Sequence, residues 1–439
     1  MAFVRSIGRW TMTALVINCI IGSGIFGLPS ELTRLLGRAS PFAMIFAACT
    51  MAVMMACIAE VASQFSAPGG AYLYARTAFG RFFGMQIGWF ELLSVTGGLA
   101  AVASIFVNYF TAFLSWSVST WERAALLIFV IAIPTVVNCF GVRGGANLSN
   151  VMTIAKLLPL LLLILFGITR FTKQPQMIHA SEILSPGLSN WVSALVLLVF
   201  AYGGWEDGLL PGGEVQEPRR TIPFALGAGL LTCAGIYMLL QFITVATIGG
   251  KITDAPLRET ALVLFGHSGA MLVTIAVLIS TYAWISGAML YGPRLAYSLA
   301  AQGDFPAGFA RLHTRFHTPW AAILLFAFIG WLLATAGTFL WLVALASGSM
   351  IIEYAGLCAS LIRLRKLSPN AEAFRIPFGP VFSVVGTAIA ITLLTGLKRR
   401  VLFLMCVTAL IASANWLWAR RHHLELETKA KAAAPLSPL

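Results

Sequence analysis

The chain has 439 residues, of which 59% are hydrophobic and only 10% are charged. Soluble domains usually contain about 45–50% apolar and about 25% charged residues, so in water this chain would expose large apolar patches. Its formal net charge of +13 does not indicate nucleic acid binding, because the basic residues lie in short gaps between apolar runs. The composition excludes an ordinary soluble enzyme and predicts an integral membrane protein that binds no nucleic acid.

Apolar segments of about 20 residues, long enough to cross a bilayer as a helix, recur along the whole chain. In chain order we expect twelve membrane-spanning helices at residues 10–30, 41–65, 84–116, 123–140, 150–169, 190–212, 221–248, 269–301, 319–336, 338–362, 381–397 and 400–418. The gaps between them leave no room for a soluble domain. We therefore expect an all-α membrane protein with one transmembrane domain over residues 1–418 and a cytoplasmic tail over residues 419–439.

Lysine and arginine are more frequent in the gaps that become cytoplasmic when both termini lie inside the cell. This bias predicts a multi-pass protein of the inner cell membrane with both termini in the cytoplasm. The basic cluster at residues 398–400 is the exception to this pattern, and it affects the placement of the last two helices.

Two of the expected helices are interrupted. The first contains Gly22, Ser23 and Gly24, and the sixth contains Gly203-Gly204 followed by further glycine and proline. Glycine lowers helix stability by about 1 kcal/mol relative to alanine, and proline removes a backbone donor. Small residues in one helix alone could serve close helix packing. Breaks at corresponding places, five helices apart, instead predict an inverted-repeat transporter with a site near the middle of the membrane.

A broken helix in the membrane leaves unbonded N–H groups at a positive helix end, which suit a carboxylate. The opposing freed carbonyl groups suit an ammonium group. An α-amino acid presents both charges on the same carbon atom, so the two breaks predict a zwitterionic amino acid as substrate.

Two motifs at these breaks resemble a known family. Residues 20–26 (IIGSGIF) resemble the first-helix signature of the amino acid–polyamine–organocation superfamily, and residues 200–205 (FAYGGW) resemble the sixth-helix break of its L-type amino acid transporter branch. Residues 68–74 are similar to its re-entrant loop before helix three, and residues 213–223 to its loop between helices six and seven. The resemblance implies a leucine-transporter-like fold, with a first repeat over 10–169, an inverted second repeat over 190–362, and two further helices over 381–418.

The resemblance also implies a set of substrate-binding residues. Backbone amides of the first break would hold the substrate carboxylate, and backbone carbonyls of both breaks would hold its ammonium group. Phe200 matches an aromatic gate over the substrate, and the small Gly204 would leave room for a side chain. The full implied set is Ile20, Gly22, Ser23, Gly24, Phe200, Ala201, Tyr202, Gly203 and Gly204.

Lys156 is the most informative charge in the chain. A lysine at the centre of a membrane helix costs about 2.5–3.5 kcal/mol, so it should be paired or functional. By the resemblance, it stands where sodium-coupled relatives bind their cation, and it would bridge the first break to hydroxyl groups on helix eight. The candidates there are Ser280, Thr281 and Ser286. A fixed charged strut and a titrating proton carrier are both compatible with this position.

The acidic residues suggest several roles. Glu206 and Asp207 directly follow the sixth-helix break, where the L-type branch usually has an uncharged residue at the position of Glu206. This departure admits a cationic substrate, a proton site or a buried hydrogen bond between helices. We expect Glu60 to be structural and Glu91 to pair with a loop arginine, while Glu353 is a functional candidate because it lies within a membrane helix.

No pattern in the chain indicates a metal centre, a cofactor or an enzyme. None of the seven cysteines forms a CxxC pair, and the six histidines fall in loops and the tail, so neither a metal site nor a disulfide framework is expected. A membrane enzyme would need a nucleophile–base or metal constellation, and a channel would need repeated pore-lining polar residues or a filter sequence. We therefore expect a carrier.

The leading interpretation is a sodium-independent secondary transporter of neutral L-amino acids, working by exchange or facilitated transport with alternating access. The alternative is a proton-coupled carrier of cationic amino acids or polyamines, which Glu206 and Asp207 favour. Animal L-type transporters join a glycoprotein subunit through a cysteine between helices three and four. Residues 115–122 contain no cysteine, so we expect no disulfide-linked heavy subunit.

Overall fold

The computed structural model describes residues 7–65, 70–140, 146–173, 186–206, 215–367 and 374–433. This part of the chain is a bundle of helices, with one isolated bridge between Ile7 and Val215. In chain order the elements are α1 (Arg9–Ile20), α2 (Gly24–Gly27), α3 (Pro29–Leu36), η1 (Gly37–Ala39), α4 (Ser40–Ser63), α5 (Gly70–Phe79), α6 (Arg81–Phe113), α7 (Thr120–Phe140), α8 (Ala146–Lys173), α9 (Leu188–Tyr202), α10 (Pro218–Ile248), α11 (Pro256–Ala301), η5 (Ala307–Ala310), α12 (Trp320–Ala336), α13 (Phe339–Leu367), α14 (Gly379–Leu394) and α15 (Arg399–Ala433).

Seven helical segments of the described chain are long and apolar enough to cross a membrane. The helices α9, α12 and α14 are apolar but shorter. Large apolar side chains are exposed on the outer helices, for example Phe129 on α7, Phe328 on α12 and Val384 on α14. Lipid rather than water suits such a surface, which confirms the prediction of a multi-pass, all-α membrane protein. The twelve-helix count and the inverted repeat stay predictions.

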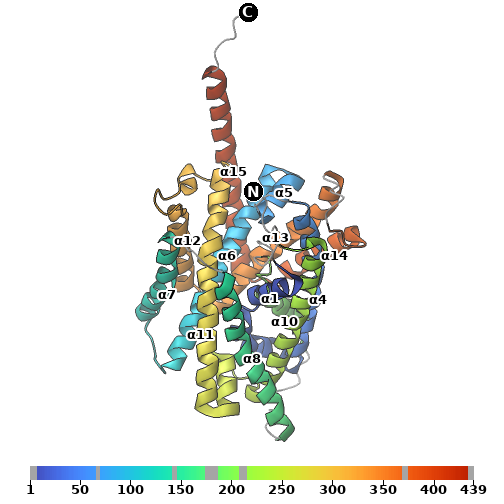
Figure 1. Cartoon of the computed structure of the whole chain (residues 1–439), viewed down its shortest axis with the longest axis vertical. Helices are drawn as coiled ribbons and strands as arrows, with labels where there is room; N and C mark the ends of the chain where they lie inside the picture. Colours follow the sequence, from blue (N-terminus) through green and yellow to red (C-terminus); the bar gives the residue numbers. More distant parts are fainter. Residues whose placement is uncertain are drawn as a thin grey trace, which may run out of the picture.

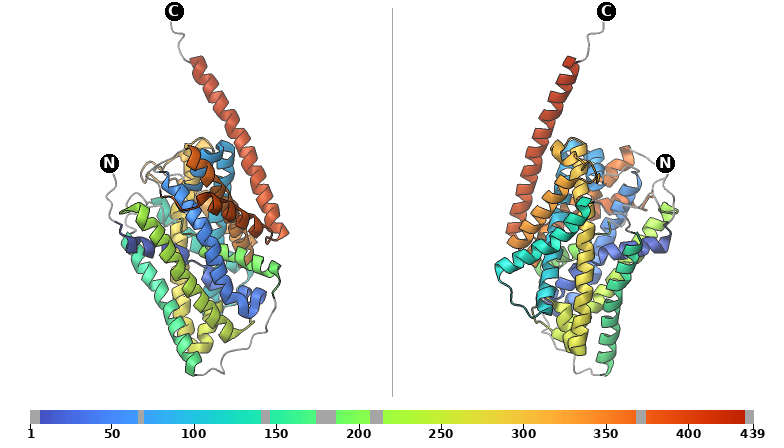
Figure 2. Two further views of the ribbon diagram at one scale, coloured as in Figure 1. Left: turned by 90° about the vertical axis from the view of Figure 1, so that its right-hand side faces the viewer. Right: turned by 60° about the vertical axis from the view of Figure 1, so that its left-hand side comes forward.

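Most helices run along the long axis of the molecule (Figure 1). In the interior, α6 packs against both α11 and α13. The helices α7 and α12 lie side by side on one flank, while α4 packs against α10 on the other. The last helix, α15, contacts α6 and α13 and then extends well beyond the bundle (Figure 2). Its helical structure continues to Ala433, through much of the segment that the sequence predicts as a tail.

The first expected membrane segment is broken, as predicted. The helix α1 ends at Ile20, and the N–H group of Gly22 donates to the Ile20 carbonyl at 2.8 Å in a tight turn. The chain resumes as the short helix α2 and continues as α3 to Leu36, beyond the predicted end at residue 30.

The sixth expected segment is also broken where predicted. The helix α9 ends at Tyr202, Gly203 is extended, and Gly204 has a φ of 88°, a conformation that favours glycine. Gly208, Pro211 and Asp207, which belong to the same prediction, lie outside the described residues. The two breaks meet in space, because a Cβ atom on Gly24 would lie 2.6 Å from the Cα atom of Ala201.

Two other elements differ from their predicted bounds. The helix α11 begins at Pro256 rather than at residue 269, and it is kinked at Gly266, where φ is 69°. The helix α5 occupies most of the segment that the resemblance assigns to a re-entrant loop. The positive φ of Gly266 interrupts the regular helical repeat of apolar residues. The first turns of α11 therefore do not continue the pattern from which the sequence predicts the helix.

Candidate functional site

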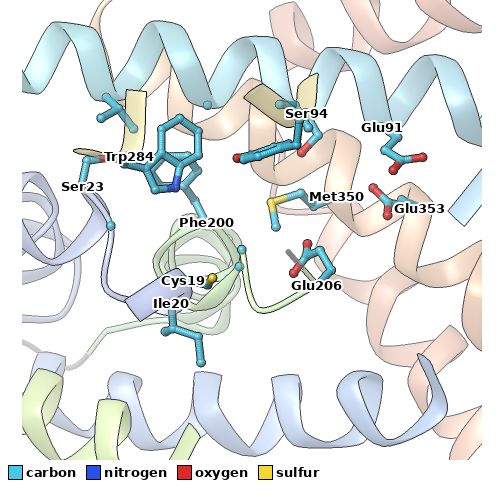
Figure 3. Close-up of a pocket in the computed structure, with 17 residues that line it drawn as sticks. Cys19, Ile20, Ser23, Glu91, Ser94, Phe200, Glu206, Trp284, Met350 and Glu353 are labelled. Atoms are coloured by element: carbon cyan, nitrogen blue, oxygen red, sulfur yellow. The ribbon is translucent and has the colours of Figure 1, made fainter. Parts of the chain in front are cut away.

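A cavity lies where the two helix breaks meet. Its empty volume is about 630 Å³, a value that includes the solvent space at its open mouth. Its walls come from both breaks and from α6, α11 and α13 (Figure 3). Seven of the predicted site residues line it, namely Ile20, Gly22, Ser23, Phe200, Gly203, Gly204 and Glu206.

The first break offers hydrogen-bond donors beside this cavity, which Gly22 and Ser23 line and Gly24 does not. The N–H group of Gly22 is already used in the turn with Ile20, whereas those of Ser23 and Gly24 make no backbone hydrogen bond within the described chain. The hydroxyl group of Ser23, in a side chain that is only 1% exposed, has no partner there either. Ser23 is therefore the residue of the predicted carboxylate site with the most unused hydrogen-bonding capacity.

The second break divides its residues between the cavity and the protein interior. Phe200 is half-buried and lines the cavity with Gly203 and Gly204. Ala201 packs against Gly24 instead. The hydroxyl group of Tyr202 donates to the Met44 carbonyl at 2.9 Å, on the α4 side of the break. Ala201 and Tyr202 thus lie behind the cavity wall, where they hold the break in place.

Lys156 reaches the first break from α8. Its side chain is 5% exposed, and its Nζ atom donates to the carbonyl of Asn18 and, at 2.9 Å, to that of Ile21. These carbonyls lie at the end of α1, where the helix is interrupted and cannot bond them internally. The lysine charge is therefore held by backbone dipoles that the break makes available.

The predicted link from Lys156 to helix eight is not among the hydrogen bonds of the described chain. Thr281 donates to the carbonyl of Val277 at 2.7 Å, and Ser286 donates to that of Tyr282 at 3.0 Å, both within α11. The hydroxyl group of Ser280 is buried without a partner in the described residues. These hydroxyl groups do not line the cavity.

Sequence reasoning missed Tyr237 of α10, which joins the two breaks. Its hydroxyl oxygen lies 3.1 Å from the carbonyl oxygen of Ile20 and 3.1 Å from that of Ala201. A tyrosine in an apolar helix gives no sequence signal for such a role. Trp284 and Met350 were missed for the same reason: Gly22 lies close to the indole ring of Trp284, and a Cβ atom on Gly203 would overlap the end of Met350.

The acidic residues separate into structural and cavity-lining groups. Glu60 is fully buried, and Arg365 donates to its two carboxylate oxygens at 2.6 and 2.7 Å, which confirms its structural role. Glu91 does not pair with a loop arginine in the described chain; it lines the cavity together with Glu206 and Glu353. The hydroxyl group of Tyr354 donates to Glu206 at 2.6 Å.

The fold and the site together define a class of protein. A multi-pass helical bundle has a cavity between two interrupted helices, with the unused N–H group of Ser23 on one wall and a lysine behind the same break. This is the arrangement of secondary membrane transporters, which bind substrate at broken helices.

Comparison with known proteins agrees with this class. The family model for amino acid permeases matches residues 7–418, so the chain belongs to the amino acid permease family, a family of membrane transporters rather than enzymes. The chain is similar to the serine/threonine exchanger SteT of Bacillus subtilis (strain 168), at 28% identity over 331 residues, which cover 73% of this chain and 74% of the relative.

Two further relatives are named for different classes of amino acid. The large neutral amino acids transporter small subunit 2 of Mus musculus is 27% identical over 340 residues, covering 74% of this chain and 63% of the relative. The vacuolar cationic amino acid transporter 4 of Arabidopsis thaliana is 23% identical over 384 residues, covering 82% and 63%. The family thus includes proteins named for neutral and for cationic amino acids.

Proposed function

We propose that this chain is a sodium-independent secondary transporter of L-amino acids, working by exchange or facilitated transport with alternating access. The observation that carries the proposal is the ammonium group of Lys156 on the carbonyls of Asn18 and Ile21. Unwound carbonyls of broken helices are the groups with which transporters of this architecture coordinate sodium. A lysine that already occupies them supplies the positive charge itself and removes the need for a metal cation.

The α-carboxylate of the substrate would be held at the first break. The N–H groups of Ser23 and Gly24 and the hydroxyl group of Ser23 are the donors with unused capacity. The positive charge of Lys156 behind the same turn adds electrostatic attraction for an anion. Gly22 would line the site without donating a hydrogen bond to the substrate, since its N–H group is used in the turn.

The α-ammonium group would be held at the second break. The carbonyls of Ile20 and Ala201 already lie near the hydroxyl group of Tyr237. The carbonyls of Phe200 and Gly203 accept no backbone hydrogen bond outside α9 in the described chain, so they are the better acceptors. Phe200 and Trp284 line the same cavity and would close over the bound substrate as the helices rock.

A neutral side chain on the substrate is the sequence prediction, because of the resemblance to the L-type branch. The three carboxyl groups in the cavity wall favour the other interpretation that the sequence leaves open, a cationic side chain. Transport by the chain alone, in the inner cell membrane with both termini in the cytoplasm, is part of the same proposal.

Thermal unfolding of the purified protein tests the zwitterion site. A panel of L-amino acids should contain members that raise Tm, because a ligand that binds only the native state stabilises it. Amines and carboxylic acids with the same side chains lack either the α-carboxylate or the α-ammonium group of the amino acid. They should raise Tm much less. Equal stabilisation by a primary amine without a carboxylate would contradict the assignment of the carboxylate to Ser23 and Gly24.

A further inference from the structure

A second cavity lies at the junction of α12, α13 and α15. Its empty volume is about 1030 Å³, a value that includes the solvent space at its open mouth. The residues that line it are Ala336, Gly337, Thr338, Trp341, Arg399, Arg400, Phe403 and Leu404. This cavity and the substrate cavity share no lining residue among those that the structure describes, so its ligand has to be sought separately.

The turn from α12 to α13 forms one wall of this second cavity. The helix α12 ends at Ala336, and Gly337 is extended. The N–H group of Trp341, in the first turn of α13, donates to the Thr338 hydroxyl group at 3.4 Å. A Cβ atom on Gly337 would overlap the ring of Trp341, so the indole packs directly on the backbone of the turn. This wall thus presents a half-buried aromatic ring and an exposed hydroxyl group.

The other wall is strongly basic. Lys398, Arg399 and Arg400 follow one another at the start of α15, and all three side chains are exposed. Arg399 and Arg400 line the cavity. No acidic residue of the described chain forms an ion pair with any of the three. Adjacent like charges repel one another, so an anion placed among them would be stabilised.

The same cluster is the exception to the charge bias of the chain. With both termini in the cytoplasm, as proposed, residues 398–400 lie at the outer face of the membrane, where lysine and arginine are otherwise less frequent. Basic residues at the inner face favour this orientation, and these three act against it. A role in binding an anion accounts for residues that membrane orientation alone does not explain.

An apolar stripe begins at the same cavity. Phe403, Leu410 and Leu417 of α15 are 68%, 69% and 50% exposed, and their regular spacing places them on one face of the helix. Phe403 itself lines the cavity. Figure 2 shows α15 running from this end past the bundle and beyond it. An exposed apolar surface therefore leads away from the basic wall along a single helix.

A basic wall that continues into an apolar stripe matches an amphiphile with an anionic headgroup. Guanidinium groups bond phosphate oxygens in pairs, and tryptophan and arginine at helix ends lie at the level of the lipid headgroups. Basic pockets between membrane helices bind anionic lipids through such contacts. Free phosphate would use the arginines but not the apolar stripe, so charge and shape together favour a lipid.

We propose that the junction of α12, α13 and α15 is a binding site for one anionic phospholipid of the surrounding bilayer. Arg399 and Arg400 hold the phosphate group, and the ring of Trp341 borders the headgroup. An acyl chain lies along Phe403 and Leu410. The lipid thereby joins the start of α15 to the turn between α12 and α13. This site does not depend on the proposed transport function or on its substrate.

Native mass spectrometry of the purified chain, titrated with lipid in detergent, tests the site. Phosphatidylglycerol and phosphatidylcholine with the same acyl chains differ in the net charge of the headgroup. The first phosphatidylglycerol molecule should bind about 10-fold or more tightly than phosphatidylcholine, because each nearby basic residue adds attraction for an anionic headgroup. Equal affinity for the two lipids would overturn the proposal.

Two anions without acyl chains separate a lipid site from a site for a free anion. Glycerol 3-phosphate and inorganic phosphate should leave phosphatidylglycerol bound, even in large excess over the lipid, because they cannot use the apolar stripe. Displacement of the lipid by either anion would assign the arginines to a free anion and overturn the lipid site.

Paired variants locate the bound lipid. Arg399→Gln combined with Arg400→Gln should weaken phosphatidylglycerol binding about 10-fold or more. The matched control, Arg219→Gln combined with Arg220→Gln, removes two adjacent exposed arginines at the start of α10. It should change the affinity about twofold or less, because distant charges are screened. Equal weakening in both pairs would assign the effect to net charge and contradict the site.

The same spectra keep the proposal testable in two further cases. Should a double variant fail to fold, Arg400→Gln and Arg220→Gln are compared in the same way. A second copy of the chain is the other possible occupant of this face. We expect the lipid-free chain and its Arg399 and Arg400 variant to have the same oligomeric state; a lipid-free dimer that the variant converts to a monomer would assign the face to a second copy and overturn the lipid site.

Discussion

Lys156 is held in the bundle by backbone carbonyls. Its ammonium group donates to Asn18 and Ile21 at the end of α1, where a continuous helix would have consumed these carbonyls in its own hydrogen bonds. The glycines of the first break thus leave carbonyl groups free, and the lysine of α8 bonds them, although the two segments are far apart in the sequence. A buried charge that helps to hold a break open should matter for turnover as well as for stability.

Replacing Lys156 with methionine keeps much of the side-chain volume and removes the charge. Each carbonyl left without a donor costs about 1–3 kcal/mol, so we expect Tm to fall and the uptake rate to drop about 10-fold or more. Lys156→Arg, which keeps the charge and the donors, should retain more stability than Lys156→Met. Thermal unfolding and uptake measured on the same preparations check this, and full activity of Lys156→Met would remove Lys156 from the mechanism.

Glu60 illustrates a buried acid with a structural task. Besides its two bonds to Arg365, it accepts from the N–H group of Ile376 at 2.8 Å, and so joins α4, α13 and the segment before α14. Removing one partner of such a pair costs about 3 kcal/mol. Glu60→Gln should lower Tm clearly and leave the relative uptake of different amino acids unchanged; altered selectivity would show that Glu60 acts on the site.

At the scale of elements, the close approach of the two breaks is the central feature. Gly24 lies against Ala201 with no room for a Cβ atom, which brings the start of α2 and the end of α9 together beside the cavity. Gly203 is similarly tight against Met350. Glycine is required at Gly24 by the neighbouring backbone rather than by its own torsion angles.

Gly24→Ala tests this contact directly. The added methyl group would overlap Ala201, and overpacking of this kind costs about 1–3 kcal/mol. We expect transport to be lost or strongly reduced, because the breaks must separate to relieve the overlap. Gly227→Ala in α10, where a Cβ atom meets nothing within 4 Å, is the matched control and should transport normally. Normal uptake by Gly24→Ala would show that the breaks need not touch.

Elements that depend on the properties of their own residues can be predicted from the sequence, whereas those that depend on tertiary packing cannot. Both breaks are predictable, since glycine and proline interrupt helices through their own backbone preferences. The seven long apolar segments of the described chain are predictable because their hydropathy is high over the length that a bilayer requires. The start of α11 is not, because Gly266 kinks it. Tyr237, Trp284 and Met350 reach the site by tertiary packing alone, and one aromatic or methionine in an apolar helix looks like any other.

The acidic residues of the cavity were also only partly predictable from the sequence. Glu206 is conspicuous in the sequence because it follows a break, and Glu353 because it lies in an apolar run. Their convergence with Glu91 on one cavity depends on how α6 and α13 pack, which no local pattern encodes. This three-residue arrangement is therefore visible only in the structure.

On the scale of the whole molecule, a polar network ties four elements together at one end of the bundle. Asp304 follows α11, is fully buried, and is paired with Arg81 at 2.5 Å and Arg76 at 3.7 Å. The hydroxyl group of Tyr72 on α5 also donates to it. Asn415 of α15 donates to the Asp304 carbonyl at 2.9 Å, so α5, α6, α11 and α15 are joined through one residue.

Asp304→Ala should therefore destabilise the whole bundle. It leaves two arginines without their buried counter-charge, and we expect a loss of about 3 kcal/mol, seen as a clear fall in Tm. The control is Glu217→Ala, which removes an exposed ion pair with Arg220 and should cost about 1 kcal/mol or less. Equal effects of the two substitutions would contradict the role assigned to this network.

Sodium-independent amino acid transport is tested most directly by uptake into proteoliposomes of the purified chain. Labelled L-lysine, L-leucine and L-alanine would be offered to vesicles with and without internal amino acid, in sodium chloride and in choline chloride. We predict substrate-specific, saturable uptake of at least one of them, at the same rate in both salts, because Lys156 occupies the carbonyls that a sodium ion would use. Uptake that requires sodium would contradict the account at its centre.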